Sequence, residues 1–158
     1  MRAAPFVIDW PAPGRLAVMP RPAGGQWLTD DLTALRESGV DTLVCALSEQ
    51  ERERMGLTEQ PAVAHQLGLA YIGFPIPDFG VPDPEELRRL AAGLADEVSD
   101  GRFVVVHCFG GIGRSGVIAG ATLIRLGATA EQAMELITKA RGVPAPETAE
   151  QRDLLRTL

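Results

Sequence analysis

The sequence has few of the residues that build metal centres and disulfide frameworks. Its 158 residues include only two cysteines and two histidines. Cys45 and Cys108 lie far apart in the chain, and their positions match no zinc-ligand spacing. We therefore expect no structural metal, no cofactor and no disulfide framework.

Long apolar runs are also missing. The longest apolar stretch in a helical pattern, residues 116–124, ends at Arg125, far short of the ~20 residues that a membrane span needs. Only a few apolar residues separate Arg2 from Asp9, which is not the pattern of a signal peptide. We expect a cytoplasmic protein that does not bind membranes.

Positive charge is in deficit. Fifteen Lys and Arg residues stand against 21 Asp and Glu residues, which gives a formal net charge of -6. Such a surface disfavours nucleic acid or an anionic membrane as a partner, so any anion site must be local. Alanine, glycine, arginine and proline are abundant, a composition that suggests a GC-rich bacterial genome.

The residues that are present indicate a single globular domain over residues 1–158. Hydrophobic residues make up 46% and charged residues 23% of the chain, which excludes a disordered chain. The length suits one compact domain with a sizeable core.

Short apolar runs alternate with helical patterns along the chain. Strands are predicted at 6–8, 16–19, 41–46, 70–74 and 103–107, and helices at 30–38, 58–67, 83–98, 115–126, 129–141 and 148–158. The last strand, FVVVH, is continuously apolar, which is typical of a central strand covered on both faces. We expect an α/β domain with a central, mostly parallel sheet of four to five strands flanked by helices.

The most informative segment is VVVHCFGGIGRSGVIAG, a buried strand that leads through a glycine-rich turn into a helix. Five residues separate Cys108 from Arg114, and three of them are glycine, so the backbone can curl and point its N–H groups inward. The predicted anion cradle consists of Phe109, Gly110, Gly111, Ile112, Gly113 and Arg114.

The residue types in this loop fit phosphate-ester chemistry. The helix that begins near Arg114 directs the positive end of its dipole at the loop, which favours a bound phosphate and the nucleophilic thiolate form of Cys108. Arg114 offers a planar fork to two phosphate oxygens. Ser115 can donate its hydroxyl to the sulfur when the sulfur leaves.

Each feature taken alone has an ordinary structural explanation. A cysteine after an apolar strand is usually a small buried hydrophobe, and an arginine that opens a helix is usually a solvated surface group. The coincidence of strand, cysteine, glycines, arginine and helix in one register favours the functional interpretation. A nucleotide-binding P-loop is excluded, because no Gly-Lys-Ser/Thr occurs.

The segment HCFGGIGRS resembles the HC-x5-R-S/T signature of the protein tyrosine phosphatase superfamily. Within it, the wording GGIGRSG most resembles the kinase-associated phosphatase group and related dual-specificity enzymes. The resemblance covers roughly residues 20 to 158. It implies the cysteine-phosphatase fold and a cysteinyl-phosphate intermediate on Cys108.

In that family the general acid is an aspartate on a mobile loop about thirty residues before the cysteine. The segment PIPDFGVPD offers Asp78, followed by Pro82. A carboxylic acid there would protonate the leaving oxygen and then activate water. The alternative is that Asp78 is only a turn residue. Asp83 is a rival acid, although its place before Pro84 favours helix capping.

A later family motif, R-P-G-A-x-x-T-x-x-Q, carries a glutamine that positions the hydrolytic water. The segment RGVPAPETAEQ keeps the spacing of Thr148 and Gln151, but its proline is displaced and the distance from Arg141 is one residue longer. The resemblance therefore implies a catalytic Gln151, against the alternative of a surface helix residue.

The resemblance also implies the substrate class. The chain lacks the tyrosine-recognition segment of the classical enzymes, so a shallow pocket is expected for phosphotyrosine, phosphoserine and phosphothreonine in proteins. Phosphoinositides or small phosphate esters are the alternative, although the loop lacks the lysines typical of lipid-cleaving relatives. Two other functions fit the sequence less well. Arsenate reductases carry their loop near the N-terminus, whereas about a hundred residues precede Cys108 here. A non-catalytic phosphate-binding adaptor would be expected to lack the cysteine, the arginine or the acid, and all three are present.

Cys45 ends a predicted strand in TLVCALSE. Parallel strands present their carboxyl ends at one sheet edge, so Cys45 and Cys108 are expected to be neighbours. In kinase-associated and lipid-phosphatase relatives a cysteine at a similar strand end pairs with the nucleophile under oxidation. The resemblance thus implies a reversible Cys45–Cys108 disulfide, against the alternative of a structural core cysteine.

Overall fold

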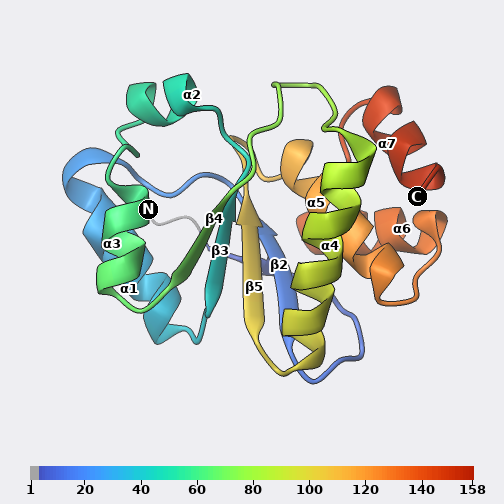
Figure 1. The fold of residues 1–158 in the computed structure, drawn as a ribbon, viewed down its shortest axis with the longest axis horizontal. Coiled ribbons are helices and arrows are strands. Elements are labelled where there is room, and N and C mark those ends of the chain that lie inside the picture. Colours follow the sequence, from blue (N-terminus) through green and yellow to red (C-terminus); the bar gives the residue numbers. More distant parts are fainter. Residues whose placement is uncertain (1–3) are drawn as a thin grey trace.

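The computed structural model describes residues 4–158, which form one sheet with helices on both faces (Figure 1). The strands are β1 Phe6–Val7, β2 Arg15–Met19, β3 Thr42–Cys45, β4 Ala70–Gly73 and β5 Phe103–His107. A short 3-10 helix, η1 Gly25–Trp27, precedes the α-helices. These are α1 Leu28–Glu37, α2 Glu49–Arg54, α3 Gln60–Gln66, α4 Pro84–Ser99, α5 Arg114–Arg125, α6 Ala130–Arg141 and α7 Ala149–Arg156.

The five strands lie in the order β1-β2-β5-β3-β4. Strands β2, β5, β3 and β4 run parallel, and only β1 is antiparallel to its neighbour β2. All five residues of β5 are buried, as its apolar run predicted. The expected α/β class and the mostly parallel sheet are confirmed.

Alternate residues along the strands pack into two different apolar cores. Val44, Val104 and Val106 pack with the cluster that includes residues of α4, α5 and α6. Leu43 and Val105 pack with the cluster that includes residues of α1 and α3. Helices therefore cover the sheet on both sides, which is why its strands read as continuous apolar runs (Figure 1).

Helix α5 lies in the middle of the larger core. Ten of its residues, Arg114 to Leu123, are buried, and it contacts α4, α6 and α7. Because α5 is enclosed, the turn that joins β5 to it is anchored at both ends. The loop is thus fixed at the carboxyl edge of the sheet, where ligands of such folds bind.

One helix was not predicted from the sequence. Helix α2 is built from EQERER, which has no apolar periodicity and contains no buried residue. It is stabilised instead at its N-terminus, where Ser48 and Glu51 form a capping box. The pattern Ser-x-x-Glu was the available signal.

Two negative findings concern the chain from residue 4 onwards. No helix there is both long and apolar enough to cross a bilayer. Over the same residues, no group of three or more His, Cys, Asp or Glu side chains is placed to hold a metal ion.

Candidate active site

Cys108 is the first residue after β5, and the loop folds back around its sulfur. The Gly111 backbone N–H donates to Cys108 Sγ at 3.3 Å, and Ser115 Oγ lies 3.3 Å from the same sulfur. Cys108 is only 3% exposed. The sulfur thus lies at the bottom of the loop, within hydrogen-bond distance of a backbone N–H and a hydroxyl group.

Two adjacent glycines differ in what they do in this loop. Gly111 has φ +74, and a Cβ there would lie 2.4 Å from the carbonyl carbon of Met19. Gly110 has no atom within 4 Å of the place where its Cβ would stand. The turn therefore requires glycine at position 111, both for its backbone angle and for its close approach to the end of β2.

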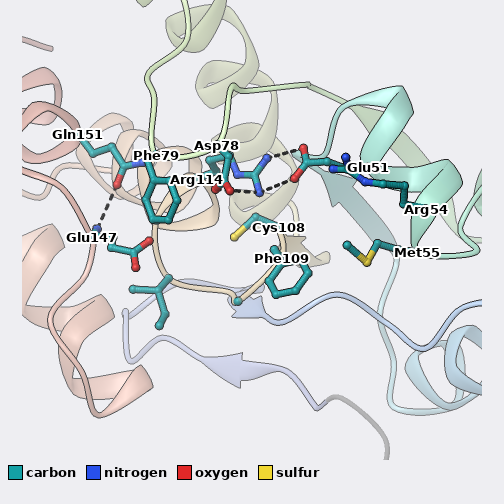
Figure 2. A pocket seen from close by; sticks show the side chains of 13 residues that line it. Glu51, Arg54, Met55, Asp78, Phe79, Cys108, Phe109, Arg114, Glu147 and Gln151 are labelled. Atoms are coloured by element: carbon teal, nitrogen blue, oxygen red, sulfur yellow. Dashed lines mark hydrogen bonds and ion pairs between the residues drawn. The ribbon is translucent and has the colours of Figure 1, made fainter.

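Arg114 is the first residue of α5, and its side chain is only 2% exposed. Its guanidinium makes a bidentate pair with Glu51, with Nη1–Oε1 at 2.7 Å and Nη2–Oε2 at 3.0 Å (Figure 2). Nη1 also donates to the Ile76 carbonyl oxygen at 3.1 Å. These contacts fix the plane of the fork beside Cys108.

Glu51 was not predicted from the sequence as a residue of this site. Its hydrogen bond with Arg114 is the largest cause that lowers the pKa of the Glu51 carboxyl, to about 2. The carboxylate is therefore charged at any pH near neutrality, and it also caps α2 through the Ser48 N–H. One side chain thus ties the arginine of the loop to the helix that sequence analysis did not predict.

Asp78 lies in the loop between β4 and α4, and Figure 2 shows it beside Arg114. Its Oδ1 is 3.3 Å from Arg114 Nη2, while the side chain is 58% exposed. The next residue, Phe79, has φ +60 and an exposed ring. Asp83 instead accepts the Glu86 N–H at 3.0 Å as the N-cap of α4. The acid predicted from the sequence is thus the carboxylate nearer to the loop.

These residues surround a pocket of about 350 Å³. Cys108 lies at its base, and the loop contributes Phe109, Gly110, Ile112, Gly113 and Arg114 to the wall. Gly111 packs behind this wall, against Met19 and Pro20. The pocket is also lined by the rings of Phe79 and Phe109 and by the side chains of Arg54 and Met55 (Figure 2).

Gln151 comes from α7 and also lines the pocket. Its Oε1 accepts the N–H groups of Glu147 and Thr148, both at 3.1 Å, and its Nε2 donates to the Gly80 carbonyl at 3.1 Å. The side chain therefore connects the start of α7 to the loop that carries Asp78. Its role toward water stays a prediction.

Cys45 is the last residue of β3, and its Cα is the register partner of His107, the residue before Cys108. Its side chain packs in the α1 and α3 cluster, whereas Cys108 belongs to the cluster on the other face. Burial raises the pKa of the Cys45 thiol. A disulfide between the two would need a side chain to move across the sheet edge, and the pairing stays a prediction.

The comparisons with known proteins agree with this geometry. Residues 17–128 match the family described as "Tc-R-P: Polymorphic toxin system, DSP-PTPase phosphatase". Cyclin-dependent kinase inhibitor 3 of Rattus norvegicus is 28% identical over 127 residues, and that of Homo sapiens is 27% identical. Each match covers 79% of this chain and 60% of the relative, so the chain spans well under the full length of these proteins.

Solved structures share the fold over nearly the whole chain. Kinase-associated phosphatase, with its catalytic-site cysteine replaced by serine, superposes with a TM-score of 0.89 at 21% identity, over 98% of this chain and 93% of that one. Tk-PTP in its active form gives a TM-score of 0.77 at 26% identity, over 98% and 95%. Because the matched family covers residues 17–128, more than half of its length, the chain belongs to the DSP-PTPase phosphatases.

Proposed function

We propose that the protein hydrolyses phosphate monoesters on proteins, both phosphotyrosine and phosphoserine or phosphothreonine, through a cysteinyl-phosphate intermediate. One observation carries the proposal: Cys108 Sγ lies within 3.3 Å of the Gly111 N–H and of Ser115 Oγ. The Arg114 fork and the Asp78 carboxylate line the same pocket. The groups that we propose as nucleophile, anion cradle and acid therefore all line one pocket.

In the first step the phosphate of the ester lies in the loop, against the loop N–H groups and Arg114. The Cys108 thiolate attacks phosphorus, so that an S–P bond forms while the P–O bond to the leaving group breaks. Asp78, protonated beforehand, gives its proton to the departing oxygen. The products of this step are the free alcohol or phenol and a phosphorylated Cys108.

In the second step a water molecule attacks the phosphorus of the intermediate. Asp78, now a carboxylate, takes a proton from that water as the P–O bond forms and the S–P bond breaks. The Ser115 hydroxyl, 3.3 Å from Sγ, donates to the sulfur as it leaves. We assign Gln151 to hold this water, which requires its Nε2 to exchange the Gly80 carbonyl for the water.

The substrate class rests on the walls of the pocket. The loop residues between Cys108 and Arg114 contribute no charge, so nothing in them selects the extra phosphates of an inositol lipid. Phe79 and Phe109 are 59% and 49% exposed, and both line the pocket. Apolar rings around a single-phosphate site suit a phosphorylated side chain of a protein.

The decisive experiment is Cys108→Ser. The hydroxyl is barely ionised at neutral pH, so we expect turnover to disappear while the loop N–H groups and Arg114 still bind phosphate or vanadate. Wild-type and variant rates on an aryl phosphate, with vanadate binding measured by calorimetry, give the answer. Residual hydrolysis within tenfold of the wild-type rate would contradict the mechanism.

A substrate panel tests the class of ester. Phosphopeptides, phosphoinositides and nucleotides are compared at equal concentration with the purified protein. We expect the highest kcat/KM on phosphopeptides and full activity in the presence of a chelator. A strict requirement for a divalent ion, or a preference for lipids, would assign the site to another chemistry.

A further inference from the structure

Two polar side chains, those of His107 and Gln60, are buried behind the loop. His107 is the last residue of β5, and Gln60 is the first residue of α3; both are 0% exposed. Gln60 Nε2 lies 2.8 Å from His107 Nε2, and His107 Nδ1 lies 3.2 Å from the carbonyl oxygen of Cys108. The contacts form a continuous line from α3 to the nucleophile's own backbone.

The chemistry of these atoms fixes where the proton lies on the imidazole. An amide nitrogen can only donate, so His107 Nε2 must accept and the ring proton must lie on Nδ1. From Nδ1 it is donated to the Cys108 carbonyl. Burial, with the Arg114 charge as a smaller cause, lowers the pKa of His107 to about 4, so the ring is neutral.

The reversed orientation of the Gln60 amide conflicts with this neutral ring. With Oε1 facing His107, the ring would need a proton on Nε2 for that contact and another on Nδ1 for the Cys108 carbonyl. That is the imidazolium form, which burial disfavours. The donor orientation is therefore the one that satisfies both contacts.

The buried amide of Gln60 makes an unfavourable contribution to the stability of the fold. Its Oε1 is buried and has no hydrogen-bond partner among the residues that the structure describes. Leu57 and Ala64, near it on either side in sequence, belong to the apolar α1 and α3 cluster. An apolar side chain would avoid an unpaired acceptor, so packing does not account for a glutamine at this position.

The contact with His107 explains the glutamine at position 60. In a trans peptide the carbonyl and the following N–H point in opposite directions. Holding the Cys108 carbonyl against His107 therefore directs the Phe109 N–H away from the ring. It also keeps a carbonyl oxygen from turning into a site that binds an anion, where the two would repel.

We propose that Gln60 is a positioning residue of this site: by donating to His107 Nε2 it fixes the Nδ1–H tautomer, and through it the first peptide group of the phosphate loop. Its effect on turnover rests on the proposed function. Its effect on the imidazole and on the reactivity of the Cys108 thiol does not.

The first test compares Gln60→Leu with Gln66→Leu, a control that changes the same residue type at an exposed position of α3. The rate of Cys108 alkylation by iodoacetamide is followed against pH, and kcat against KM for an aryl phosphate. We expect Gln60→Leu to change the pH profile of alkylation and to lower kcat roughly tenfold, because the loop N–H groups lose part of their fixed orientation. The control should match wild type.

Gln60→Glu separates positioning from mere occupancy of the space. Its carboxylate has nearly the shape of the amide but can only accept, so Nε2 must carry a proton and the neutral Nδ1–H ring is lost. We expect the ¹⁵N spectrum of this variant to lack the unprotonated Nε2 signal at pH 7, and its alkylation profile to differ from that of wild type. A folded Gln60→Leu, or a folded Gln60→Glu, with the alkylation profile of wild type would overturn the proposal.

The last measurement needs no variant. The protein has only His65 and His107, so the ¹⁵N shifts of the buried ring can be assigned. We expect a protonated Nδ1 and an unprotonated Nε2 at pH 7; the opposite tautomer would refute the proposal even if every variant failed to fold. If the tautomer and the alkylation shift are found but no phosphate ester is hydrolysed, the proposed function fails and the inference about Gln60 stands.

Discussion

Single residues divide the chemistry of this pocket between two loops. Arg114 and Cys108 are fixed by the turn into α5, whereas Asp78 comes from a loop whose side chains are more exposed. This difference suits their proposed roles, because a general acid must approach the leaving oxygen and later the water, while a nucleophile must stay in place.

The role of Asp78 can be tested by changing the leaving group. Asp78→Asn should slow hydrolysis of alkyl phosphates far more than of activated aryl phosphates, by about 10²-fold or more for the alkyl esters, since only poor leaving groups need the proton. The measurement is kcat on both ester types over a range of pH. The pH dependence that the general acid imposes, a fall in rate as it loses its proton at higher pH, should also disappear in the variant.

Asp83→Asn is the matched control. Asn caps a helix as well as Asp does, so the contact with the Glu86 N–H should persist and α4 should remain intact. We expect rates near wild type on both esters. Equal losses on the two esters in Asp78→Asn, or a larger effect at Asp83, would move the acid role to another group.

The residues that the sequence singled out most clearly lie close to one another in the chain. Cys108, Arg114 and Ser115 lie within eight positions of one another in a strand–turn–helix segment, and the structure keeps them together. Glu51 and Gln60 could not be found in this way. Each reaches the loop from across the fold, Glu51 to Arg114 and Gln60 to His107, and a pattern in one sequence carries no record of such contacts.

At the level of elements, the phosphate loop is shaped by its closeness to β2. The Cβ of an alanine at position 111 would lie 2.4 Å from Met19 C and 2.6 Å from Pro20 N, both backbone atoms that cannot swing aside. The residue also has φ +74. The loop can therefore keep its form only if position 111 has no side chain.

Gly111→Ala should accordingly lose both phosphate binding and turnover. We expect kcat/KM to fall by at least about 10²-fold, because misplacing the loop N–H groups removes preorganised donors to the phosphate. Gly110→Ala, one position earlier, meets no atom within 4 Å and should stay within a few-fold of wild type. Vanadate affinity and kcat/KM for both variants decide the matter; similar losses at the two positions would contradict this account of the loop.

The strands were easier to predict from the sequence than the short helix α2. Continuous apolar runs placed all five strands to within two residues at each end. Helix α2 was missed because its stabilisation is polar, through the Ser48 and Glu51 capping box and the Glu51 pair with Arg114. Apolar runs in the sequence reveal buried strands, whereas the sequence of this helix contains only the polar residues that stabilise it.

For the molecule as a whole, His107 links the active site to stability in acid. Burial lowers its pKa to about 4 in the folded state, against about 6.5 when unfolded. Between these values the unfolded state binds a proton that the folded state does not, so stability declines as pH falls below about 6.5 and the loss levels off below about 4. Glu51, held near 2 by Arg114, adds its own loss only below about pH 4.5.

Denaturant unfolding between pH 7 and 5 should reveal this. We expect the free energy of unfolding to fall by about 2 kcal/mol over that interval, from the shift of His107 alone. His107→Gln should flatten the dependence, while His65→Gln at an exposed position should leave it unchanged. A wild-type free energy that is flat from pH 7 to 5 would mean that His107 is not held neutral.

Arg114 has two carboxylate partners, and this affects the release of the product. Its Nη2 already meets Glu51 Oε2 at 3.0 Å and Asp78 Oδ1 at 3.3 Å. A phosphate ester that binds to this nitrogen takes the place of Asp78, and the freed carboxyl group can then carry the proton that it gives to the leaving oxygen. The same competition acts on inorganic phosphate once the intermediate is hydrolysed. Return of Asp78 to Arg114 then helps to expel the product, so the enzyme should tolerate free phosphate better than one whose arginine stands unpaired.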